Sequence, residues 1–261
     1  MKKTSKSAKK PVLSVIIPAY NEEENIAPTV EAVRQKLRSH AIPYEIVVVN
    51  DNSKDKTPDI VRALQKKDRS IKLVNRTPPG GFGRAVRSGL ENFTGDIVTI
   101  VMADLSDDPE DIVRYYELIA NQGYDAAFGS RFVKGGKVVE YPRTKLFVNR
   151  IVNKMLQLLF WTRHNDLTNA FKAYRADVVR SCMPLKGAHF NITIELSLSV
   201  LIRRYKIASC PIRWYGRKWG QSNLKLRAMG RRYLATLIKI WFERLLILDD
   251  LMAEKSEIKP E

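Results

Sequence analysis

Cysteine and histidine are scarce in this chain of 261 residues, which has two cysteines and three histidines. Cys182 and Cys210 lack the spacing of a metal site and are too few for a disulfide framework, so a reducing compartment is indicated. His40, His164 and His189 show no catalytic spacing. We expect all three histidines to be solvated or structural.

Long apolar runs are missing too. No window of about 20 residues is apolar enough to cross a bilayer. The best candidates, 192–202 and 234–252, are interrupted by Glu195 in the first and by Lys239 and later charges in the second. The basic segment 1–10 is followed by an ordinary strand pattern rather than an apolar leader. We therefore expect a chain that touches a membrane without crossing it.

Acidic residues are outnumbered, with 28 Asp and Glu against 45 Lys and Arg and a net charge of +17. Twelve basic residues and one acidic residue, Glu243, lie between Arg203 and Arg244. Such an excess favours a polyanionic partner: nucleic acid, anionic lipid or a phosphorylated substrate.

The first half of the chain alternates between two patterns. Apolar runs predict buried strands at 12–20, 44–51, 71–76, 96–104 and 125–131. Helical periodicity lies between them, at 26–37, 59–66, 80–90 and 111–122. This order predicts an α/β fold with a Rossmann-like, doubly wound, mostly parallel sheet and right-handed crossovers.

Ligands of such sheets bind at the carboxyl ends of the strands. The residues there are largely acidic and polar: Tyr20–Glu22, Asp51–Ser53, Asp104–Asp108 and Ser130–Arg131. Acidic strand ends argue against nucleic acid, because they repel phosphates unless a metal is bound. The second half predicts helices at 150–162 and 196–204, a strand at 207–215, and a long amphipathic helix at 226–248.

Several segments, in this order and spacing, resemble family 2 glycosyltransferases of the GT-A fold. They are SVIIPAYNEEENI, VVVNDNSKDKT, GGFGRAVRSGL and MADLSDDP. GSRF, DLTNAFKAY and RKWGQSNL are similar to the dolichyl- or polyprenyl-phosphate mannosyltransferase branch of that family. The resemblance implies four parts: a disordered basic arm at 1–11, a GT-A domain at 12–222, an amphipathic membrane-proximal helix at 223–250, and a tail at 251–261.

The resemblance also implies an activity. It is inverting transfer of a sugar, with mannose favoured, from a nucleotide-sugar, with GDP-mannose favoured, to a polyprenyl or dolichyl phosphate. The enzyme would be cytoplasmic and peripherally associated with the inner face of a membrane. Its oligomeric state stays open.

Nucleotide binding is implied for six residues: Pro18, Tyr20, Glu22, Asp51, Gly83 and Ala103. An aromatic face can stack on a base, and a carboxylate can accept hydrogen bonds from ribose hydroxyls or base N–H groups. The alternatives are an ordinary strand-end turn at Glu22, turn chemistry at Asp51 and a simple loop around Gly83.

The D-x-D metal motif of the fold is incomplete here, because its first position is Met102. A hard cation, Mg²⁺ or Mn²⁺, prefers oxygen ligands, and the resemblance places it on Asp104 with Ser106. We expect Asp108 to cap the next helix, whereas the role of Asp107 is undecided.

Catalytic roles are implied for Asp104, Arg131, Asp166 and Glu195, and acceptor or phosphate binding for Arg150, Lys172, Arg217 and Ser222. The fixed fork of an arginine suits phosphate. Ordinary ion pairs are the alternative for the arginines and for Glu195. A phosphate acceptor attacks without a protein base, whereas a hydroxyl acceptor would need one, with Asp166 or Asp107 as candidates.

Two other functions remain open. One is a family 2 transferase that uses a UDP-sugar and a saccharide hydroxyl. The other is a degenerate, non-catalytic nucleotide-binding homologue, for which Met102 and Asn50 are the best support because both depart from the family pattern.

Overall fold

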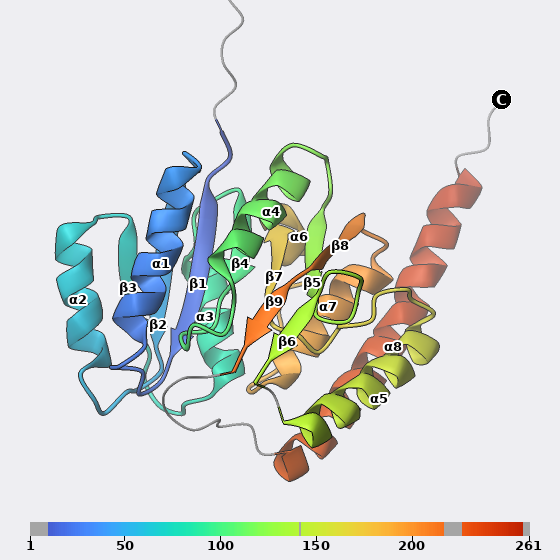
Figure 1. The fold of residues 1–261 in the computed structure, drawn as a ribbon. Helices are drawn as coiled ribbons and strands as arrows, with labels where there is room; N and C mark the ends of the chain where they lie inside the picture. Colours follow the sequence, from blue (N-terminus) through green and yellow to red (C-terminus); the bar gives the residue numbers. More distant parts are fainter. Residues whose placement is uncertain (1–9, 141, 217–225, 258–261) are drawn as a thin grey trace, which may run out of the picture.

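A seven-stranded sheet forms the centre of the computed structural model, which describes residues 10–140, 142–216 and 226–257. The strand order is β3-β2-β1-β4-β7-β5-β8 (Figure 1). The strands are β1 (Leu13–Ala19), β2 (Tyr44–Asn50), β3 (Ile71–Asn75), β4 (Ile97–Ile100), β5 (Ala126–Ser130), β7 (Lys172–Arg175) and β8 (Ile207–Pro211). All neighbours pair in parallel except β7, which is antiparallel to both β4 and β5. The predicted α/β class is confirmed.

Helices cover both faces of the sheet, as expected when both faces of a strand are apolar. The helices are α1 (Ile26–Ser39), α2 (Thr57–Lys67), α3 (Phe82–Asn92), α4 (Pro109–Ala120), α5 (Arg143–Phe160), α6 (Ala176–Ser181), α7 (Asn191–Ile202) and α8 (Leu226–Glu257). One core cluster joins the sheet to α1, α2 and α4, and the other joins it to α3, α5, α6, α7 and α8 (Figure 1). Along β1, Val15 and Ile17 belong to the first cluster and Ile16 to the second.

The predicted strand at 207–215 is wrong as a single element. β8 ends at Pro211, and β9 (Arg213–Tyr215) pairs with β6 (Lys137–Val139) in a separate two-stranded sheet. Proline has no N–H to donate to a strand ladder, so the break falls at this residue. The turn brings β9 over the loop that follows β4, where the Tyr215 N–H donates to the Ser106 carbonyl at 2.9 Å.

Three helices extend several residues beyond their predicted bounds, and α7 begins at Asn191, ahead of the predicted start at Leu196. α5 begins at Arg143, ahead of the predicted start at Arg150, and α8 continues to Glu257, past the predicted end at Leu248. At the end of α8 the residues are mostly polar and hide the apolar periodicity on which the prediction depends. At the start of α5, Leu146, Phe147 and Val148 are consecutive and so do not show helical spacing. β7 was not predicted at all, because its pairing with β4 and β5 joins segments far apart in the chain.

α8 packs on α7, which is buried along almost its whole length. Leu237 and Ile240 of α8 are buried in this contact, and the Asn191 amide donates to the Thr236 hydroxyl at 3.0 Å. The C-terminal amphipathic helix is therefore docked on the domain through one face. No described helix is long and apolar enough to span a membrane.

Candidate active site

The carboxyl ends of β1, β2, β4 and β5 lie at the same lower edge of the molecule in Figure 1. The parallel register places Pro18 beside Val49 and Ala19 beside Asn50, so the turns after β1 and β2 are adjacent. Among the predicted nucleotide residues, Tyr20 and Glu22 follow β1 and Asp51 follows β2. The predicted metal residues Asp104 and Ser106 follow β4, and Arg131 follows β5.

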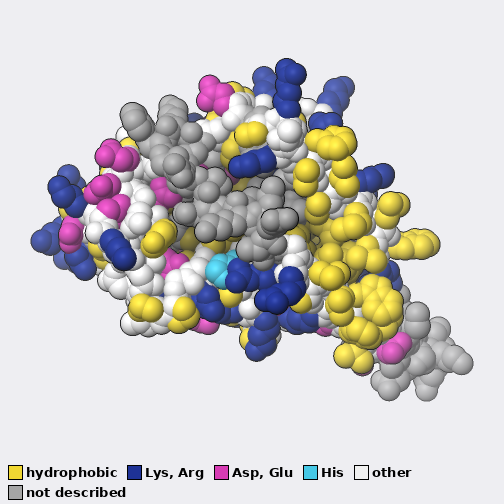
Figure 2. All heavy atoms as spheres, turned by 90° about the horizontal axis from the view of Figure 1, so that it is seen from below, with side chains coloured by type: hydrophobic (Ala, Val, Ile, Leu, Met, Phe, Trp, Pro, Cys, Tyr) yellow, Lys and Arg dark blue, Asp and Glu magenta, His cyan; other side chains and the backbone are white. Residues whose placement is uncertain are grey.

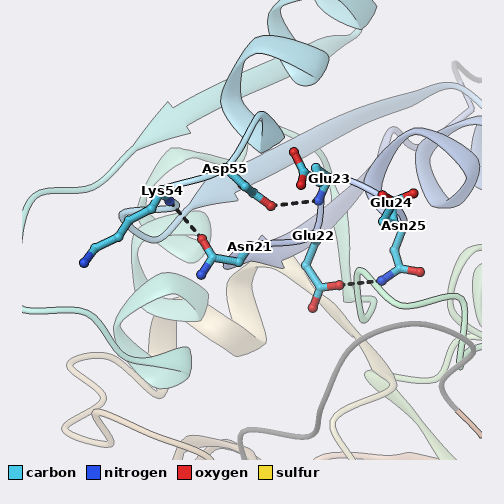
Figure 3. A pocket seen from close by; sticks show the side chains of 7 residues that line it. All are labelled: Asn21, Glu22, Glu23, Glu24, Asn25, Lys54 and Asp55. Carbon is cyan, nitrogen blue, oxygen red and sulfur yellow. Dashed lines mark hydrogen bonds between the residues drawn. The ribbon is translucent and has the colours of Figure 1, made fainter.

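The turn after β1 is fixed by polar contacts. The Glu22 N–H donates to the Thr57 hydroxyl, and the Asn25 amide donates to the Glu22 carboxylate, both at 2.8 Å. Glu22 is buried, whereas Tyr20 is 44% exposed and presents its ring to solvent. Figure 3 shows Glu22 on the wall of a small pocket of about 350 Å³ that also includes Lys54 and Asp55.

Asp51 lies in the turn after β2, where two groups hold its carboxylate. The Gly81 N–H donates to Oδ2 at 2.5 Å, and the Arg76 guanidinium bonds Oδ1. Asn50, which replaces the first acid of the family pattern, closes the turn by accepting from the Ser53 N–H at 3.1 Å. The hydrogen bond within the turn thus explains Asn50 at this position. Asp51 is oriented by its hydrogen bond from Gly81 in the glycine-rich segment.

Gly83 is required by close packing. A Cβ there would lie 2.6 Å from the His189 carbonyl oxygen and closer still to that of Gly187. The Gly83 N–H donates to the Ala188 carbonyl at 3.1 Å. The start of α3 therefore rests on the loop 186–189, and this contact explains the glycine without any ligand.

Asp104 follows β4 in a tight turn whose next residue, Leu105, has a φ of 59°. The Asp104 carboxylate accepts from the Ser106 N–H at 3.2 Å, and both residues are buried. Ala103 is also buried, and its carbonyl accepts from the Thr29 hydroxyl.

The acids after Asp104 have separate roles. Asp108 accepts from the Glu110 N–H at 3.0 Å, with Pro109 at the first turn of α4, so its predicted role as helix cap is confirmed. Asp107 accepts from the Met102 N–H at 2.9 Å. Burial, with the nearby Asp104 charge, raises the pKa of Asp107 to about 8.

Arg131 and Asp166 form a buried bidentate ion pair. Arg131 donates from Nε at 2.8 Å and from Nη2 at 2.7 Å, and its backbone N–H adds a third bond at 3.0 Å. Both oxygens of Asp166 are thus engaged. The Arg150 guanidinium stacks on Phe132, 5.2 Å from the ring centroid, and the Arg131 guanidinium lies at the same distance. Arg150 is therefore close to this pair.

The structure gives Lys172 a different environment from the predicted phosphate contact. Its side chain is fully buried, and its ammonium donates to the carbonyl oxygens of Leu167, at 3.1 Å, and Asn169. Burial lowers the pKa of Lys172 to about 7, against the opposing effect of the Asp166 charge. Lys172 holds the loop that carries Asp166 and does not reach the surface.

Glu195 is likewise occupied by the protein. Its carboxylate accepts from the N–H groups of Lys186, at 2.9 Å, and Gly187, at 2.6 Å, and from the Lys239 ammonium of α8, at 2.6 Å. The side chain is 1% exposed. We therefore assign Glu195 to positioning the loop 186–189, which supports the start of α3, rather than to a contact with the sugar.

A divalent cation fits the donor set at the end of β4, because Asp104 and Ser106 offer hard oxygen ligands. No group of three or more His, Cys, Asp or Glu residues able to hold a metal occurs within the described residues. That sparse arrangement is typical of Mg²⁺ sites in which substrate phosphates supply further ligands. Arg217 and Ser222 lie outside the described residues.

Sequence reasoning missed two residues that matter for this geometry. Arg76, the residue after β3, holds Asp51, and Lys239 holds Glu195 across 44 positions of the chain. Arg76 could have been found, since β3 ends beside β2 in a parallel sheet. Lys239 could not have been found, because the sequence pattern of an amphipathic helix does not show which buried acid a lysine on its polar face contacts.

Comparison with known proteins identifies the family. The model for glycosyl transferase family 2 matches residues 14–182. The chain belongs to this family. Its match spans both strand ends that carry Asp51 and Asp104 and the Arg131–Asp166 pair.

Curated relatives extend the match toward the C-terminus. A dolichol-phosphate mannosyltransferase of Pyrococcus furiosus is 34% identical over 82% of this chain and 59% of its own length. An undecaprenyl-phosphate mannosyltransferase of Micrococcus luteus is 30% identical over 80% of this chain and 86% of that protein. A polyprenol monophosphomannose synthase of Mycolicibacterium smegmatis is 32% identical, covering 80% of each chain. The chain thus spans about three fifths of the Pyrococcus protein and most of the other two.

Solved structures agree on the fold. Glucosyl-3-phosphoglycerate synthase of Mycobacterium tuberculosis, in complex with UDP, matches with a TM-score of 0.66 at 19% identity. The match covers 88% of this chain and 80% of that one. The same enzyme with Mn²⁺, UDP and glucosyl-3-phosphoglycerate also has a TM-score of 0.66. The arrangement of the sheet and its helices is therefore that of GT-A glycosyltransferases.

Proposed function

We propose that this chain is an inverting glycosyltransferase that moves a sugar from a nucleotide-sugar to a polyprenyl or dolichyl phosphate. Mannose is the favoured sugar and GDP-mannose the favoured donor. Three relatives at 30–34% identity carry names of this activity. In this proposal Tyr20, Glu22 and Asp51 hold the nucleoside.

One observation favours a phosphate over a hydroxyl as the acceptor. A hydroxyl needs a base, yet both oxygens of Asp166 accept bonds from Arg131. The other candidate, Asp107, is buried, and its carboxylate accepts a hydrogen bond from the Met102 N–H inside the turn after β4. A phosphate is already ionised and attacks without a base, so the protein has only to align the reactants and balance charge.

The residues divide this work by position. Arg150 is exposed near the Arg131–Asp166 pair, where its fork suits the acceptor phosphate. Asp104, with Ser106, would hold Mg²⁺ or Mn²⁺, which when bound neutralises charge on the leaving nucleoside diphosphate. Asp166 keeps Arg131 in place. In-line attack on an α-linked donor gives a β-linked product.

We also propose that the enzyme binds the inner, cytoplasmic face of a membrane peripherally. Two helices support this, because they expose apolar side chains that are gathered on one side of the molecule (Figure 2). These are Phe147, Val148, Ile151, Met155, Leu158 and Leu159 on α5, and Leu234, Ile238, Trp241, Phe242, Leu245 and Leu246 on α8. We call this the α5–α8 face. Exposed patches of this kind mark interaction sites.

A donor panel tests the proposal. The full chain is incubated with GDP- and UDP-sugars, a polyprenyl phosphate and Mn²⁺, and glycolipid is measured. We expect product with a GDP-sugar. Asp104→Ala should abolish transfer, whereas Asp59→Ala, an exposed acid of α2, should leave it unchanged. Nucleotide binding without transfer from any donor would favour the degenerate homologue, and transfer only to a saccharide hydroxyl would favour the other alternative.

A further inference from the structure

A second cavity, of about 380 Å³, lies where the ends of α5 and α7 meet α8. Phe160 and Trp161 line it from the end of α5, Leu201 and Ile202 from the end of α7, and Leu248 from α8. This is the far end of α5 from the candidate active site. An α-helix rises about 1.5 Å per residue, so Phe160 lies about 15 Å along the helix axis from Arg150.

The polar lining of this cavity is basic. Arg204 and Arg244 are its charged residues, and no acidic side chain lines it within the described part of the chain. Arg244 makes a long contact, 3.4 Å, from Nη1 to the Leu159 carbonyl. Nearby Glu243 is neutralised by Arg203, which donates to it at 2.8 Å. The guanidinium groups of Arg204 and Arg244 therefore leave a net positive charge beside the apolar side chains that line the cavity.

The cavity opens beside the α5–α8 face. Leu158 and Leu246, neighbours of its lining residues, are each 67% exposed. Trp161 is 88% exposed and ends α5 in a left-handed conformation, with φ of 50°. Tryptophan is enriched at membrane–water interfaces, where one part of the ring is apolar and the other polar. Positive charge at the edge of an apolar face matches a lipid with an anionic headgroup.

We propose that this cavity binds the phosphate headgroup of an anionic phospholipid, whose acyl chains lie on the α5–α8 face. The site is separate from that of the acceptor phosphate at Arg150. It rests on the proposed peripheral membrane association. Arg204 and Arg244 donate hydrogen bonds to the phosphate. The bound lipid thereby sets the distance between the bilayer and the edge of the sheet that carries the candidate active site.

Vesicle binding tests the proposal. The full chain is mixed with phosphatidylcholine vesicles with and without phosphatidylglycerol, and sedimentation gives the dissociation constant. The double variant Arg204→Gln/Arg244→Gln should bind the anionic vesicles more than about 30-fold more weakly. General attraction alone contributes about fivefold for each basic residue near the surface, and a built site adds to it. The matched control Lys154→Gln/Arg231→Gln removes the same charge from exposed positions of α5 and α8, and should lose clearly less. An equal loss of vesicle affinity in the two double variants would overturn the proposal, because it would show general electrostatic attraction to the anionic surface rather than a specific headgroup site.

Two further arms complete the test. Inorganic phosphate, at ionic strength matched with chloride, should not displace the protein from the vesicles; displacement would mean that the site takes the free anion, against the proposal. Transfer to a short, water-soluble prenyl phosphate, measured without vesicles, should be the same in wild type and double variant, and a loss there would contradict a site separate from the acceptor's. Absence of transfer in the wild type would defeat the proposed function alone, because vesicle binding is read independently. Circular dichroism confirms that each variant is folded, and Arg204→Lys/Arg244→Lys should bind more tightly than the glutamine variant.

Discussion

Asp166 forms a buried ion pair with Arg131. Removing one partner of a buried ion pair costs about 3–5 kcal/mol. We expect Asp166→Asn to lower the free energy of unfolding by that amount, measured by urea denaturation. Asp177→Asn removes an exposed partner of Arg175 and should cost less than about 1 kcal/mol. Similar losses in the two variants would mean that Arg131 is stabilised in another way.

His164 makes stability depend on pH. Burial, aided by the charges of Arg163 and Lys172, lowers the pKa of His164 from 6.5 to about 4. The folded state therefore keeps the ring neutral while the unfolded state protonates it. Its contribution is complete above pH 6.5 and is lost as the pH falls toward 4.

Urea midpoints measured from pH 7 to pH 4 check this. Wild type should lose on the order of 2 kcal/mol more than His164→Gln over this interval. His40→Gln, an exposed control, should follow the wild-type curve. A parallel pH dependence in wild type and His164→Gln would exclude His164 as the cause.

At the scale of elements, the start of α3 depends on Gly81 and Gly83, which pack closely against the loop 186–189. Because a Cβ at Gly83 would collide with the carbonyls of the loop 186–189, Gly83→Ala should destabilise the protein by about 1–3 kcal/mol. It should also weaken nucleotide binding, measured by calorimetry. Gly230→Ala is the control: it meets open space on α8 and should stabilise by up to about 1 kcal/mol.

The same loop depends on α8. Lys239→Met removes a charged donor from Glu195 and should cost about 1–3 kcal/mol. Hydrogen exchange at the N–H groups of Lys186 and Gly187 should become faster, whereas Arg231→Met, at an exposed position of α8, should leave them protected. Unchanged exchange in Lys239→Met would show that the backbone contacts hold the loop without α8.

At the scale of the whole molecule, most of the architecture could be predicted from the sequence. Apolar runs such as Leu13–Ala19 are long enough to identify a buried strand, and their order gives the parallel sheet. β7 could not be predicted, because its pairing with β4 and β5 depends on chain segments far apart. The motifs place Asp51, Asp104 and Arg131 at one edge, as the structure does.

The roles of buried charges were harder to predict. Lys172 and Glu195 were both assigned to ligands, and both are engaged by backbone groups that a linear pattern does not place nearby. A charged residue in an apolar run signals an unusual environment, but the partner decides whether that environment is a binding site or a structural contact.

The pairing of Glu195 with Lys239 has a consequence for synthesis in the cell. The acid is made 44 residues before its base, which at about 5–20 residues per second corresponds to about 2–9 seconds of translation. During this interval α7 has no α8 to pack on, and its carboxylate has no cation. The nascent chain therefore fixes the loop 186–189, on which the start of α3 rests, only after α8 has been translated.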